Sequence, residues 1–176
     1  PARSRPDLRF VVAGPQYPAD IVWPKNVERI EHCPPADHAA FYSASRFTLN
    51  VTRADMIRAG YSPSVRLFEA GACATPIISD KWDGIETLFQ PGREIVLADG
   101  AADVLAALDR DAGAMGRAAR ARIEAAHSAD HRAAELEAQL LLGDIPATPD
   151  PLAATESDDK AGGAADEEIH SVPVDL

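Results

Sequence analysis

The stretch from Ser62 to Asp80, SPSVRLFEAGACATPIISD, constrains the fold of this chain more than any other segment. Its apolar residues fall mostly on one helical face, and Ala74-Thr75-Pro76 stops the helical pattern. The run from Pro76 to Ser79 contains two isoleucines, which is typical of a strand buried on both faces of a parallel sheet. The segment therefore predicts a loop, a helix, a turn and a buried strand in succession.

The start of this predicted helix carries the first candidate binding residues. Ser62 or Ser64 can cap the helix, and Pro63 suits a first-turn position whose N–H would have no partner. A helix N-terminus presents free N–H groups and partial positive charge to an anion. Arg66 and Glu69, three residues apart, share one side of the helix. This arrangement can hold a phosphate and a hydroxyl-bearing sugar together.

Three environments are open to the Glu69 carboxylate, which lies in the apolar context LFEAGACA. It can face solvent, pair with Arg66, or accept hydrogen bonds from the hydroxyl groups of a ligand. Burial without a partner is excluded because it would cost several kcal/mol.

The segment RLFEAGACATPIISD, followed by DGIE and PGREIVL, resembles the C-terminal domain of GT-B glycosyltransferases and is most similar to their spore-maturation, CgeB-like group. The resemblance runs from about residue 8 to about residue 141. In retaining relatives, a glutamate before Ala-x-Ala-x-Gly-x-Pro binds the ribose hydroxyls of a nucleotide-sugar, and Glu69 matches it. A second glutamate stands eight residues earlier in those relatives, where this chain has Tyr61. Ala74 stands where many relatives have glycine.

Short apolar strands alternate with helices along the chain, which predicts a doubly wound, Rossmann-like α/β domain with a mainly parallel sheet. The resemblance implies that this domain is one half of a GT-B two-domain architecture, with the N-terminal GT-B domain missing from this chain. It also implies a metal-independent transfer of sugar from a nucleoside diphosphate donor to an acceptor hydroxyl, with no cofactor, and a fragment that is inactive alone. The donor sugar, the acceptor and the catalytic base stay unknown.

Three further candidate residues follow from their positions. Asn50 and Lys81 follow predicted strands, and open α/β sheets bind ligands outside the carboxyl ends of their strands. Their alternative roles are turn formation for Asn50 and surface ion pairing for Lys81. In the resembling family the region of His32 lies near the nucleotide base, so His32 or its neighbouring backbone is a candidate contact to the base. The alternative for His32 is a solvent-facing structural residue.

The remaining elements are predicted from hydrophobic pattern and turn signals. The predicted strands besides 76–79 cover residues 9–14, 26–32, 46–52 and 93–98, and the predicted helices cover 36–45, 54–61, 102–111, 112–128 and 130–142. Residues 1–8 are predicted to end a helix that begins upstream, so we expect this chain to be a piece of a larger protein.

The net charge of −11 belongs mostly to the end of the chain. From Gly143 onward there are nine acidic residues and one lysine, which leaves −3 for the rest. The composition of this end, rich in Pro, Ala, Gly and acids, predicts a disordered acidic tail at 143–176 after a folded domain at 1–142. No basic stripe is present, so a nucleic-acid partner is not expected.

The sequence gives little support for a metal-binding protein or a membrane protein. The two cysteines, Cys33 and Cys73, have no metal-ligand or disulfide-framework spacing, so no metal site is predicted. Because no run of about 18 apolar residues and no signal segment occurs, we expect a cytoplasmic protein with no transmembrane segment. A nucleotide-sugar epimerase of the same architecture, or a non-catalytic α/β binding module, stays open as an alternative function.

We predict that truncation after residue 142 leaves the melting temperature nearly unchanged, because a tail of this composition contributes little to folding. Differential scanning calorimetry of the full and truncated chains tests this. A decrease of several degrees in the truncated chain would show that the tail packs on the domain.

Overall fold

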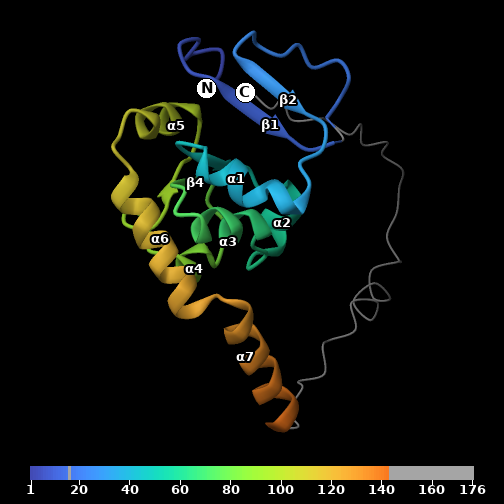
Figure 1. The fold of residues 1–176 in the computed structure, drawn as a ribbon, viewed down its shortest axis with the longest axis vertical. Helices are drawn as coiled ribbons and strands as arrows, with labels where there is room; N and C mark the ends of the chain where they lie inside the picture. The colour runs from blue at the N-terminus through green and yellow to red at the C-terminus, as the bar shows by residue number, and fades with distance from the viewer. Residues whose placement is uncertain (16, 143–176) are drawn as a thin grey trace, which may run out of the picture. The chain divides into compact units, whose positions relative to one another are not determined.

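The computed structural model describes residues 1–15 and 17–142 (Figure 1). Its contacts divide the chain into two units, of which the first is Pro1–Ser128 and the second begins at Ala129. The described part of the second unit is one helix, α7 (Ala129–Leu142). The tail predicted at 143–176 lies outside the described residues, and the predicted domain boundary at 142 stays a prediction.

From β2 onward, short strands alternate with helices through the first unit, as the sequence predicts, whereas the described residues between β1 and β2 include no helix. The strands are β1 (Phe10–Ala13), β2 (Val27–Ile30), β3 (Thr48–Asn50), β4 (Ile77–Ser79) and β5 (Val96–Leu97). The helices are η1 (Pro35–Asp37), α1 (His38–Ser43), α2 (Ala54–Ala59), α3 (Val65–Ala72), α4 (Ile85–Leu88), α5 (Ala101–Leu108) and α6 (Gly113–Ala126). Among the described residues, no helix is long and apolar enough to cross a bilayer.

All pairings between these strands are parallel, which confirms the predicted α/β class. The strands form two sheets, β1-β2 and β3-β4-β5, where the sequence predicted one mainly parallel sheet. The side chains of Leu8 and Phe10 pack in the same apolar cluster as Leu49 and Ile78. The two sheets are therefore connected through a shared core.

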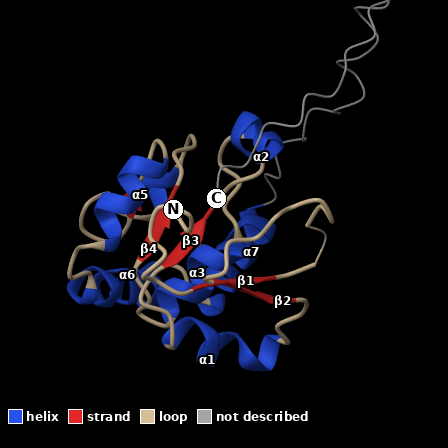
Figure 2. Ribbon diagram, turned by 90° about the horizontal axis from the view of Figure 1, so that it is seen from above, coloured by secondary structure: helices blue, strands red, loops and turns tan. Residues whose placement is uncertain are grey.

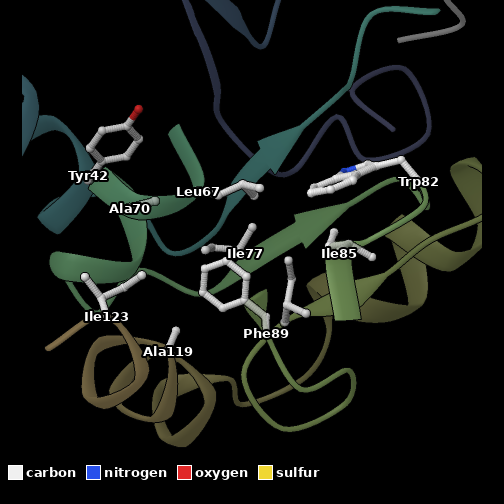
Figure 3. Packing of buried hydrophobic residues seen from close by; sticks show 10 residues of the cluster. Tyr42, Leu67, Ala70, Ile77, Trp82, Ile85, Phe89, Ala119 and Ile123 are labelled. Atoms are coloured by element: carbon white, nitrogen blue, oxygen red, sulfur yellow. The ribbon is translucent and has the colours of Figure 1, made fainter. Parts of the chain in front are cut away.

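The central strand β4 is buried on both faces, which matches the prediction for residues 76–79. Ile77 faces a core formed with α1, α3, α4 and α6, whereas Ile78 faces a core formed with α5 and the β1 region. Helices therefore cover both faces of the β3-β4-β5 sheet, with α1 and α5 on opposite sides of it (Figure 2). Figure 3 shows Leu67 of α3 and Phe89 packed around Ile77.

Helices α3 and α6 approach each other closely because glycines stand at their contact. A Cβ on Gly116 of α6 would lie 2.0 Å from the carbonyl oxygen of Ala74, which follows α3. A Cβ on Gly71 of α3 would lie 3.0 Å from Cγ1 of Ile123. The contact therefore leaves no room for a side chain at position 116.

Residues 1–8 form turns, in which the N–H groups of Ser4 and Arg5 donate to the carbonyl of Pro1 at 3.1 and 3.0 Å. The helix end predicted here is therefore limited to a single turn. Pro6 interrupts the segment because it lacks the N–H that a continuing helix would need.

We predict that Gly116→Ala destabilises the protein by about 2–4 kcal/mol, because its Cβ would displace the backbone that ends α3. Gly113→Ala on the same helix is the matched control, since a Cβ there meets its nearest atoms at 3.5 Å. The control should be neutral or more stable by about 0.5–1 kcal/mol because alanine favours the helix. Urea denaturation measures both, and equal stability of the two variants would contradict the proposed contact.

Candidate functional site

A buried polar network joins the carboxyl ends of β3 and β4. Asn50, which is only 2% exposed, donates through Nδ2 to Oγ of Ser79 at 2.9 Å and to Oγ1 of Thr52 at 3.2 Å. The carboxylate of Asp80 accepts from the N–H and the hydroxyl of Thr52 at 2.8 and 2.7 Å. The loops that follow the two strands are thereby fixed relative to each other, at the edge where α/β sheets bind ligands.

Arg66 connects this network to the first turn of α3. Its Nη1 donates to Oδ1 of Asn50 at 3.1 Å. Of the two candidate caps, Ser64 is the residue used, since its Oγ accepts from the N–H of Arg66 at 3.4 Å. Ser62 lies half-buried in the loop before the helix. Because a guanidinium has five N–H donors, Arg66 keeps donors for a ligand after its contact with Asn50.

Glu69 projects from α3 toward α1. Its Oε1 lies 3.1 Å from Nδ1 of His38, and its Oε2 accepts from the hydroxyl of Tyr42 at 3.2 Å. The side chain is 33% exposed, so part of the carboxylate remains open to solvent. Of the three environments left open for Glu69, pairing with Arg66 is not what the described contacts show, because Arg66 bonds to Asn50 and Glu69 contacts α1.

His38 is a site residue that sequence reasoning missed. Its second ring nitrogen, Nε2, lies 3.1 Å from the carbonyl oxygen of Cys33, so both nitrogens face oxygen acceptors. The Glu69 carboxylate, followed by the Cys33 carbonyl, raises the pKa of His38. His38 and Tyr42 are four apart, a spacing that places them on one helix face and could have indicated a shared partner. His32, the predicted candidate, is exposed.

Tyr42 is the buried member of this group. Burial is the main cause that raises the pKa of Tyr42, to about 12, and the nearby Glu69 carboxylate adds to it. The hydroxyl therefore stays protonated and donates to Glu69 over the physiological range. The backbone carbonyl of Tyr42 accepts from the hydroxyl of Thr75 at 2.7 Å, which ties α1 to the turn after α3.

Lys81 follows β4 and forms an ion pair with Asp99 at 2.6 Å. Both side chains are exposed, and the hydrogen bond to Asp99 raises the pKa of Lys81. The described contacts of Lys81 thus match the second of its two expected roles, which is surface ion pairing.

Tyr61 and Ala74 differ from the residues found at these positions in the family that the chain resembles, and both have a left-handed backbone conformation. Tyr61 has a φ of 47°, donates its N–H to the carbonyl of Asp83 at 2.7 Å and lies with its ring against Gly84. Ala74 has a φ of 56°, at a helix C-terminus where glycine is favoured. The ring of Tyr61 is 73% exposed near the start of α3.

The part of the chain that the structure describes holds no group of three or more His, Cys, Asp or Glu side chains able to bind a metal ion. A cavity among these residues lies elsewhere, between the 86–91 segment and Arg122 of α6. None of the residues that line this cavity belongs to the network around Asn50 or Glu69.

A family model described as "Glycosyl transferase-like" matches residues 1–138. Among solved structures, sucrose-phosphate synthase from Thermosynechococcus elongatus is 21% identical, with a TM-score of 0.53, over 68% of this chain and 31% of that chain. AviGT4, a glycosyltransferase of avilamycin A biosynthesis, is 18% identical, with a TM-score of 0.47, over 77% and 44%. No curated protein matches the chain.

The similarity to the synthase supports a Rossmann-like α/β fold. The chain spans less than a third of the synthase and less than half of AviGT4.

We predict that Asn50→Leu destabilises the protein by about 2–4 kcal/mol, since it removes one hydrogen-bond partner from each of Arg66, Ser79 and Thr52 while keeping the branched shape of the side chain. Lys81→Met is the control at the carboxyl end of the adjacent strand and should leave stability nearly unchanged, because its ion pair is exposed. Chemical denaturation compares the two. A larger effect at Lys81 than at Asn50 would contradict the assignment of the network as the structural part of the site.

Proposed function

The chain belongs to the glycosyl transferase-like family, and we propose that it binds a nucleoside diphosphate sugar and takes part in transfer of the sugar to an acceptor hydroxyl. The observation that carries this proposal is the placement of Arg66 and Glu69 on α3, with Arg66 bonded to Asn50 at the carboxyl end of β3 and Glu69 facing α1. A basic group and an acidic group held a turn apart by separate partners suit a ligand that has both an anionic part and hydroxyl groups.

The diphosphate is assigned to Arg66 and the first turn of α3. The partial positive charge of the helix N-terminus and the guanidinium both favour an anion. Asn50 fixes the guanidinium from the strand side, so little side-chain entropy remains to be lost on binding. The same two groups can stabilise the charge that develops on the diphosphate as it leaves the sugar.

The ribose is assigned to Glu69. Each carboxylate oxygen has one contact within the protein, to His38 or to Tyr42, and can accept a second hydrogen bond. Two adjacent hydroxyls of a ribose supply two such donors. The partial exposure of Glu69 leaves the carboxylate accessible to them.

In the proposed reaction, the bond between the sugar C1 and the diphosphate oxygen breaks, and the electron pair leaves with the diphosphate. The acceptor oxygen forms the new bond to C1 and releases its proton to a base that no residue assigned here supplies. Because the chain spans 31% of the synthase it resembles, we assign it to one half of a GT-B architecture, with the acceptor on the other half. The CgeB-like subgroup, metal independence and a cytoplasmic location are parts of the same proposal.

We predict that Glu69→Gln weakens nucleoside diphosphate binding roughly ten- to a hundred-fold, since hydrogen bonds to a charged group are worth about 1.5–3 kcal/mol. Gln is chosen because it keeps the length of the side chain and its amide oxygen can still accept a hydrogen bond from Tyr42, so the fold should persist. Calorimetric titration with uridine, adenosine and guanosine diphosphates measures the affinity.

Glu86→Gln is the matched control, because Glu86 is an exposed glutamate on α4. It should bind like the wild type. If Glu69→Gln also binds like the wild type, Glu69 is structural and the proposed ribose contact is wrong.

A further inference from the structure

We propose that His38 is a positioning residue that, as an imidazolium, holds the Glu69 carboxylate and the Cys33 peptide together for nucleotide recognition. This inference rests on the proposed function, in which Glu69 accepts hydrogen bonds from ribose hydroxyls. It extends that function to a residue of α1 and makes recognition of the ribose depend on the protonation state of His38.

The two contacts of the His38 ring carry the inference. Nδ1 lies 3.1 Å from Oε1 of Glu69, and Nε2 lies 3.1 Å from the carbonyl oxygen of Cys33. Both partners are acceptors, so both ring nitrogens must donate if both contacts are to be hydrogen bonds. Only the imidazolium has two N–H donors, because a neutral imidazole has one donor and one acceptor. Loss of the proton therefore releases one of the two partners.

The surroundings of His38 favour the imidazolium. The groups that face it are Glu69 from α3, Tyr42 from α1, the neighbouring Asp37, and the carbonyl of Cys33. Glu69 and Asp37 are acidic, and the Tyr42 hydroxyl stays protonated. The pKa of His38 is accordingly raised, chiefly by its hydrogen bond to Glu69. Both contacts are thus complete below about pH 6.5, the ordinary value for histidine, and one is lost as the pH rises through the raised pKa.

The two contacts of His38 arrange the ribose-binding groups before the nucleotide binds. When His38 and Tyr42 each hold one carboxylate oxygen, the remaining acceptor positions of Glu69 point in fixed directions. The Cys33 peptide, in the loop after β2, is fixed relative to them by the same ring. A ribose that binds to this fixed arrangement orders fewer side chains than one that binds after the proton has left.

The test compares the tightest-binding diphosphate of uridine, adenosine or guanosine with its 2′-deoxy form by calorimetry from pH 6 to pH 8.5. Both ligands carry the same diphosphate and base, so titration of the ligand cancels in the ratio of the two dissociation constants. We expect the preference for the ribonucleotide to be largest near pH 6 and to fall about 3- to 10-fold by pH 8.5. His38→Gln, which has one uncharged donor group, should show the weaker preference at every pH.

A second measurement needs no variant. Because linkage is reciprocal, the ribonucleotide should raise the pKa of His38, followed by NMR of its imidazole, and the 2′-deoxy form should raise it less. The role of His38 would be overturned if the preference for the ribonucleotide over its 2′-deoxy form stayed constant or rose with pH. It would also be overturned if the pKa of His38 were the same in the complexes with the two ligands. If the wild type shows no preference for the ribonucleotide at any pH, the proposed ribose contact of Glu69 fails instead.

Discussion

The close contact of α6 with the end of α3 is the constraint on which the candidate site depends. Gly116 has no Cβ, so the backbone of α6 rests directly against the carbonyl of Ala74. Gly71 lets Ile123 pack onto α3 in the same way. With one side of α3 fixed against α6, its other sides are free to carry polar groups. Arg66 and Glu69 then diverge from the helix toward the strand loops and toward α1.

The site is therefore organised around one short helix with two kinds of support. Asn50, Thr52 and Ser79 are buried, and the half-buried Asp80 completes their network. Its hydrogen bonds hold one geometry, because a buried polar group left without a partner would cost free energy. The contacts of Glu69 with α1 are only partly buried. Their geometry can thus respond to a ligand and to pH, whereas the network supplies a fixed frame.

The sequence predicted the local features of this arrangement and missed the long-range ones. The buried strand predicted at 76–79, the helix before it and a serine cap at 62 or 64 follow from patterns within a few residues. The structure confirms the strand and the helix and shows Ser64 as the cap. The contacts of Arg66 with Asn50 and of Glu69 with His38 join residues 16 and 31 positions apart. Helical spacing left a pairing of Arg66 with Glu69 open, because it describes neighbours on one helix and not the surfaces that pack against that helix. The sequence likewise did not predict the division into two sheets. Strands of two to four residues carry too short a pattern to show which strands pair with each other.

In the proposed complex a nucleotide lies across α3, with its diphosphate at Arg66 and its ribose at Glu69. A crystal structure of the chain with a saturating nucleoside diphosphate tests this most directly. We expect ribose hydroxyls within hydrogen-bond distance of Glu69 and phosphate oxygens within hydrogen-bond distance of Arg66. A nucleotide bound elsewhere, such as in the cavity beside Arg122, with Glu69 still bonded only to His38 and Tyr42, would contradict it.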